Sequence, residues 1–180
     1  IMFNMHYNKE PGPGSAVCSN IKAGITFKKD GDVIRHVTDG DQLWMNPSSL
    51  LIPAGDPSYS KSSEYEFEED VEILSFMPHM HLRGTAMSLE AILPNGRRQL
   101  LSHVGDFNFN WHNSYVYTDE AAPLLPKGTL IKVTAWYDNT AANRSNPDPN
   151  VWVGSGSRTA DEMGHAWVNV TYFDDEDYEA

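Results

Sequence analysis

The sequence predicts an all-β protein, an antiparallel β-sandwich of the jelly-roll type. Apolar and polar residues alternate over several short segments, and turns rich in Gly, Pro and Asn separate these segments at regular spacing. No segment shows the 3.6-residue apolar period of an amphipathic helix. The 180 residues are 40% hydrophobic and 21% charged, a balance and length that suit one domain with a proper core.

The expected strands follow one another along the chain. An Asn95-Gly96 pair between two alternating segments is a strong hairpin signal. Residues 53–63 are polar and are expected to form a loop, while residues 107–117 are rich in aromatic side chains. Strands are expected at residues 1–8, 21–28, 33–37, 42–45, 50–52, 65–67, 71–81, 85–93, 97–104, 130–137 and 163–173.

Composition excludes several classes of partner. The formal net charge of −12 argues against nucleic acid and against an anionic membrane surface. No stretch approaches the roughly 18 to 20 apolar residues of a membrane-spanning helix. The chain begins with Ile1 and shows no signal peptide, so we interpret it as a mature fragment or the C-terminal part of a longer polypeptide. Cys18 is either a small buried residue or half of a disulfide with a partner before Ile1.

Two histidines mark the end of the apolar segment 71–81. His79 and His81 lie two residues apart, and side chains at that spacing point to the same face of a strand, with Met80 on the other face. Two imidazoles on one face form half a metal site suited to copper, zinc, iron or nickel. The alternative is a pair of ordinary surface or core histidines.

Met163 is the candidate for the other half of the site. It begins a predicted strand directly after a loop of Gly and Ser. A thioether is a soft ligand that prefers Cu(I), so His79, His81 and Met163 together would make a His2Met copper site with an open position. The alternative is a methionine that fills the core.

Two motifs in this chain resemble a known family. The run from His79 to Gly84 and the later run from Thr159 to Met163 resemble the C-terminal domain of the copper type II, ascorbate-dependent monooxygenases, which include peptidylglycine α-hydroxylating monooxygenase and dopamine β-hydroxylase. The resemblance implies that His79, His81 and Met163 are the catalytic ligands of the copper that activates O2. Residues 3–7 resemble the last strand of the family's first domain, so His6 falls on a ligand of the second, electron-transferring copper.

The resemblance also implies an organisation for the chain. Residues 1–17 would be the last strand of a preceding β-sandwich and a linker, residues 18–174 the C-terminal copper domain, and residues 175–180 an acidic tail. The intact protein would hold two copper ions, one of them in this chain, and would take electrons from ascorbate or another reductant. An upstream domain or a partner chain would supply the missing His-His pair of the second site. Small-molecule substrate and O2 would be the other partners, and the location would be periplasmic or secreted.

Departures from the family pattern lie around the site. Met77, His165 and Trp167 stand where the peptide-amidating members have an arginine, an asparagine and a tyrosine that bind the substrate. We therefore do not expect a glycine-extended peptide as the substrate, and an apolar or aromatic one would fit better. His112 is either a surface histidine or part of the lip of the site. These four residues are the candidate pocket residues.

Three functions follow as hypotheses. The first is a copper-dependent monooxygenase domain that hydroxylates a C–H bond of an unidentified substrate. The second is a copper-binding or structural module without that activity. The third is a zinc hydrolase that uses His79, His81 and a carboxylate such as Asp161 or Glu162. Otherwise these two acids are expected to be a solvated pair or acceptors that orient an imidazole, and Gly84 is expected to serve a turn with an unusual φ angle.

Overall fold

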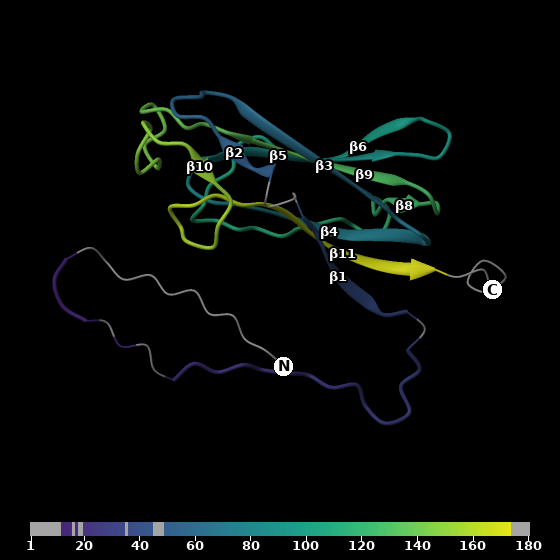
Figure 1. Ribbon diagram of the computed structural model, residues 1–180. Coiled ribbons are helices and arrows are strands. Elements are labelled where there is room, and N and C mark those ends of the chain that lie inside the picture. The colour runs from purple at the N-terminus through teal and green to yellow at the C-terminus, as the bar shows by residue number, and fades with distance from the viewer. Residues whose placement is uncertain (1–11, 16, 18–19, 35, 45–48, 174–180) are drawn as a thin grey trace. The chain divides into compact units, whose positions relative to one another are not determined.

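Antiparallel strands form nearly all the regular structure in the computed structural model (Figure 1). The structure describes residues 12–15, 17, 20–34, 36–44 and 49–173, with the backbone alone for 41–44. His6 and Cys18 lie outside the described residues, as does the strand expected at residues 1–8. Contacts divide the chain into a unit that ends at Ile34 and a unit that begins at Arg35. In the described part of the chain, no helix is long and apolar enough to cross a membrane.

The strands that the structure describes lie in the second unit. Their bounds are β1 Thr38–Trp44, β2 Leu51–Ile52, β3 Tyr59–Glu66, β4 Asp70–Met80, β5 Gly84–Ile92, β6 Arg98–Val104, β7 Tyr115–Val116, β8 Leu124–Leu125, β9 Leu130–Tyr137, β10 Val153–Gly154 and β11 Gly164–Phe173.

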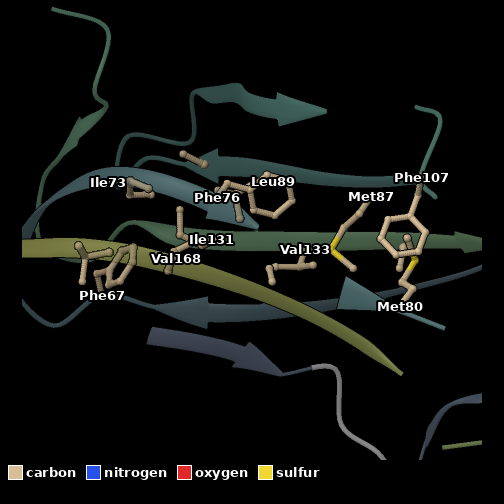
Figure 2. Packing of buried hydrophobic residues seen from close by; sticks show 14 of the residues in the cluster. Phe67, Ile73, Phe76, Met80, Met87, Leu89, Phe107, Ile131, Val133 and Val168 are labelled. Atoms are coloured by element: carbon tan, nitrogen blue, oxygen red, sulfur yellow. The ribbon is translucent and has the colours of Figure 1, made fainter. Parts of the chain in front are cut away.

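Two main sheets enclose one hydrophobic core. One sheet has the order β1-β11-β4-β7, with β8 also paired to β4, and the other has the order β3-β9-β5-β6. Alternate residues of β4, β5, β9 and β11 are buried, and their apolar side chains pack together between the sheets (Figure 2). The predicted all-β antiparallel sandwich is therefore confirmed, while the jelly-roll type stays a prediction.

Strong alternation predicted the central strands correctly, whereas three other segments differ from expectation. One is the strand expected at 33–37, where the described residues form no strand and β1 begins at Thr38. Residues 21–28 form no strand, and their apolar side chains are exposed, with Phe27 79% exposed. Alternation alone was misleading there because, in the described part of the chain, no strand pairs with this segment. The predicted loop at 53–63 is wrong at its end, since β3 begins at Tyr59. Among the described strands it pairs with β9 alone, and an edge strand tolerates the polar residues that made this segment resemble a loop.

A bulge in β4 directs His79 away from the core. The register between β4 and β11 shifts beside Leu74, which is the extra residue of a β-bulge. Core-facing positions are odd-numbered before the bulge, as at Ile73, and even-numbered after it, as at Met80. His79 therefore points to the outer face of the sheet, opposite to Met80, as the sequence predicted.

Gly84 is required by a close approach rather than by its φ angle. The described glycines with positive φ do not include Gly84, which corrects the expectation of an unusual conformation. A Cβ atom at this position would lie 2.5 Å from Cβ and 2.9 Å from Sδ of Met80. The turn that follows His81 brings β5 back against β4, and only a residue without a side chain fits there.

We expect Gly84→Ala to destabilise the protein by about 1–3 kcal/mol, the usual cost of overpacking a filled site. The nearest atom, Met80 Cβ, is fixed to the backbone of β4 and has no rotamer through which to escape. Urea denaturation measures the change. Gly24→Ala is the matched control, because nothing lies within 4 Å of a Cβ there, and it should be neutral. Equal stabilities of the two variants would contradict the packing argument.

Candidate metal centre

His79 and His81 lie together at the end of β4. His79 is the penultimate residue of β4 and is half-buried, while His81 follows the strand and is 4% exposed. Their ring centroids are 5.4 Å apart. With metal–nitrogen bonds of about 2.0–2.1 Å, two imidazoles on one metal ion have centroids roughly 5 to 6 Å apart. The spacing of this pair therefore fits two ligands of one ion.

A backbone carbonyl sets the tautomer of His81. Nδ1 of His81 lies 3.0 Å from the carbonyl oxygen of Asp161. A carbonyl oxygen only accepts, so Nδ1 carries the proton, and Nε2 of the neutral ring carries the lone pair that a metal requires. The sequence favoured a solvated acidic pair for Asp161 and Glu162, with a carboxylate that orients an imidazole as the alternative. The carboxylate of Asp161 pairs with Arg158, at 2.6 Å and 2.9 Å.

Glu162 joins the two halves of the candidate site. Its side chain is fully buried, and its carboxylate accepts hydrogen bonds from the backbone N–H groups of His81, Arg83 and Met163, the latter two at 2.9 Å and 3.1 Å. Residues separated by about eighty positions in the chain are thus held by one side chain. The expected solvated acidic pair is wrong for Glu162, because the Gly84 turn and the segment before β11 close over it.

Burial raises the pKa of Glu162 to about 7, while the three backbone donors and Arg83 oppose this change. Arg83 is itself buried, and its guanidinium donates to Oδ1 of Asn139 at 2.9 Å and to the carbonyl of Ala160 at 3.0 Å. These bonds satisfy the polar groups around the carboxylate. The result is a rigid polar network beneath the histidine pair.

The backbone N–H and the backbone carbonyl of Met163 both make hydrogen bonds. Its N–H donates to Glu162, and its carbonyl accepts from the hydroxyl of Tyr137 at 3.0 Å. Tyr137 is fully buried at the end of β9, in the opposite sheet, and burial raises the pKa of its hydroxyl well above the ordinary value. Met163 is therefore tied both to the segment that carries His81 and to the second sheet.

Three of the candidate pocket residues, Met77, His165 and Trp167, lie with His79 on the outer face of β4 and β11. In the antiparallel register His165 is opposite His79, and Trp167 is opposite Met77. Directly opposite residues project to the same face of a sheet, so all four share one surface. The ring centroids of His79 and His165 are 5.7 Å apart. Trp167 is 38% exposed and His165 is 4% exposed.

His112 reaches the same cluster from the loop between β6 and β7. Its Nδ1 lies 3.2 Å from Nδ1 of His79, and the two ring centroids are 4.8 Å apart. The rings of Phe107 and Phe109 pack against His112 with centroid distances of 5.7 Å and 5.3 Å. The structure thus brings together His79, His81, His112 and His165. Their roles as ligands or pocket residues stay predictions.

Burial lowers the pKa of His165 to about 4. A histidine in the unfolded chain titrates near 6.5, so below that pH the unfolded chain binds a proton that the native protein rejects. Stability due to this group is present above pH 6.5 and is lost as pH falls toward 4.

We therefore expect the stability of His165→Phe, in the metal-free protein, to rise by about 2 kcal/mol relative to that of the wild type as pH falls from 7 to 5. Urea denaturation at both pH values measures the gap between the two proteins. His165→Gln should behave alike, since it also removes the titrating ring. A gap that does not change with pH would contradict the burial of a neutral imidazole.

A polar cleft of about 440 Å³ opens beside His81. Its walls are the loop after β6 and the loop after β9, which contribute Asp106, Asn108, Phe109, Asn143 and Arg144 among others. Asn143 donates to the carbonyl of Leu82 at 3.1 Å, which fixes one wall to the residue after His81. None of the four candidate pocket residues lines this cleft. The sequence showed only a loop of Asn, Asp and Pro in this region and gave no signal that it meets His81.

Among the residues with described side chains, no group of three or more His, Cys, Asp and Glu side chains is arranged to hold a metal ion. The candidate copper set pairs two histidines with a thioether.

Comparisons with known proteins identify no family. No protein-family model matches the sequence, and no curated protein matches it significantly. Solved structures do match, and one of them is the structure of infectious bursal disease virus Gx strain, with 12% sequence identity and a TM-score of 0.31. That match covers 76% of this chain and 31% of the viral chain.

Proposed function

We propose that this chain is the copper-binding domain of a monooxygenase that activates O2 for hydroxylation of a C–H bond. His79, His81 and Met163 would hold one copper ion. His6 would belong to a second copper site that an upstream domain or a partner chain completes. Ascorbate or another reductant would supply electrons, and the protein would work in the periplasm or outside the cell. The isolated chain is expected to bind copper without turning over.

The observation that carries the proposal is the buried carboxylate of Glu162. It accepts from the N–H groups of His81 and Met163, so the thioether residue and one of the two histidines belong to one hydrogen-bonded unit. This carboxylate, whose pKa burial raises to about 7, fixes the backbone of two residues that carry proposed ligands. A site that must hold distant ligands in fixed positions requires such support.

The residues around the site suit the group that we propose. When bound, copper would supply the electron that reduces O2 and starts the attack on the substrate. The chain's own residues orient and enclose the reactants. Asp161 holds the tautomer of His81 through its backbone carbonyl, and neutral imidazoles with a thioether are the ligand types that favour Cu(I).

The cleft beside His81 supports a polar substrate. Carboxylate, amide and guanidinium groups line it, together with the ring of Phe109, which packs 5.9 Å from the ring of His81. This lining differs from the apolar surface of Met77 and Trp167, from which an apolar substrate was expected. We propose that a small polar molecule enters through this cleft and reaches the metal from the side of His81.

The zinc hydrolase hypothesis is less well supported. It needs a carboxylate as a third ligand or as a base. The carboxylate of Asp161 pairs with Arg158, and that of Glu162 accepts three backbone hydrogen bonds. Both candidate carboxylates are therefore engaged in structural bonds.

Removing either histidine tests the metal site. We expect His79→Ala and His81→Ala each to lower Cu(I) affinity at least about tenfold, since each removes a strong nitrogen ligand. Competition with a chromophoric Cu(I) chelator measures the affinity. His103→Ala is the matched control, because His103 is exposed on β6, and it should bind as the wild type does. Wild-type affinity in the His79 and His81 variants would reject the proposed site.

A further inference from the structure

We infer that His112 is a positioning residue that accepts a hydrogen bond from Nδ1–H of His79 and thereby presents Nε2 of His79 to the metal. The inference rests on the proposed function, because it concerns a ligand of the proposed copper site. It assigns a task to a loop histidine that lies 33 residues from its partner in the chain.

The distance between the rings of His79 and His112 indicates a hydrogen bond. The 3.2 Å between the Nδ1 atoms of His79 and His112 is a hydrogen-bond distance, and two neutral nitrogens at that distance need one proton between them. Either His79 donates and His112 accepts, or the reverse. The two arrangements have opposite consequences at the far nitrogen of His79.

The chemistry of ligation selects between the arrangements. If His79 donates from Nδ1, its Nε2 carries the lone pair and can bind a metal. If His112 donates, then Nδ1 of His79 is the acceptor and the proton of His79 sits on Nε2, which blocks ligation there. A functioning site therefore requires His112 to be the acceptor. His81 already shows the same pattern, with Nδ1 donating to the carbonyl of Asp161 at 3.0 Å.

The packing of His112 fixes the acceptor in place. Phe109 lies near both histidines, with ring centroids 5.3 Å from His112 and 5.9 Å from His81, and Phe107 packs on His112 at 5.7 Å. Phe107 is buried, and its N–H donates to the carbonyl of Thr85 at 2.9 Å, beside the Gly84 turn. The loop that carries His112 is thus anchored to the segment that follows His81.

Two substitutions separate the hydrogen bond from the packing. His112→Asn keeps an acceptor, since Oδ1 of asparagine is attached to Cγ as Nδ1 of histidine is. His112→Leu keeps similar bulk and removes the acceptor. Because His112 is exposed, neither change should unfold the protein, and thermal denaturation verifies this.

Nitrogen-15 NMR of the metal-free chain reads the tautomer of His79 directly. We expect the Nδ1–H form in the wild type and in His112→Asn, and a shift toward Nε2–H in His112→Leu. Cu(I) affinity should fall about ten- to a hundredfold in His112→Leu, as for other partners that orient a ligand, and should stay close to the wild type in His112→Asn.

The outcomes separate this inference from the proposed function. A wild-type His79 in the Nε2–H form, or equal tautomers and affinities in the two variants, would overturn the positioning role even if copper binds through Met163. If the copper spectrum shows no sulfur ligand while the tautomers behave as expected, the proposed function fails and the orientation of His79 by His112 stands.

Discussion

Replacing Glu162 with glutamine is expected to destabilise the protein by about 2–4 kcal/mol, because breaking a buried network leaves unsatisfied donors in its place. Glutamine keeps one carbonyl oxygen for the N–H groups of His81, Arg83 and Met163. Its amide NH2 is itself a donor, so it cannot accept the N–H group that faces it and leaves that group unsatisfied. Urea denaturation measures the loss.

The same variant should weaken copper binding. The segments that carry His81 and Met163 are joined through this carboxylate, so we expect Cu(I) affinity to fall about ten- to a hundredfold. Glu64→Gln on β3 is the matched control, because Glu64 is exposed, and it should change neither quantity. A Glu162→Gln variant with wild-type stability and affinity would show that the carboxylate holds nothing in place.

The raised pKa of Glu162 also predicts how the stability of the protein changes with pH. Burial raises its pKa from 4.5 to about 7, so between these values the native protein binds a proton that the unfolded chain has lost. Stability due to this group is therefore largest at low pH and falls as pH rises through the window. The gap between wild type and Glu162→Gln should narrow from pH 5 to pH 7. This slope is opposite to that of His165, whose contribution is lost as pH falls.

Removing the thioether of Met163 is expected to have the largest effect on metal selectivity. Met163→Leu keeps the volume of the side chain but removes the soft sulfur, and we expect Cu(I) affinity to fall at least about tenfold. Zinc affinity should not change, since zinc prefers nitrogen, oxygen and thiolate ligands. Met77→Leu is the matched control on the outer face of β4 and should leave both affinities as they are.

Loss of zinc and Cu(I) together in Met163→Leu would show that the substitution disturbs the site as a whole. Retention of both would show that the thioether is no ligand. Only a selective loss of Cu(I) supports the proposed ligand set.

The central strands could be predicted from sequence because apolar residues that face the core alternate with more polar residues on the other face of the sheet. In β9 every second residue from Ile131 to Tyr137 is buried, and the alternation is visible in the sequence itself. The Asn95-Gly96 turn marked the β5–β6 hairpin, and Gly96 indeed has a φ angle of 82°. Only the end of the edge strand β3 was predicted, within the strand expected at 65–67, because one neighbouring strand imposes little apolar periodicity.

The site was only partly predictable, since its support comes from contacts between distant segments. The spacing of His79 and His81 was enough to predict that they lie together. Nothing local distinguishes Glu162 from the adjacent Asp161, although the first is fully buried and the second pairs with Arg158 at the surface. The contact between His112 and His79 depends equally on how a loop folds back, which the sequence pattern does not contain.

X-ray absorption at the copper edge, on the reduced copper-loaded chain and its Met163→Leu variant, shows whether His79, His81 and Met163 bind one copper ion. We expect two imidazole nitrogens and one sulfur around copper in the wild type, and loss of the sulfur in the variant. Copper surrounded by nitrogen and oxygen alone in both proteins, or a chain that binds no copper, would contradict the His2Met site and would favour a copper-binding or structural module of another kind.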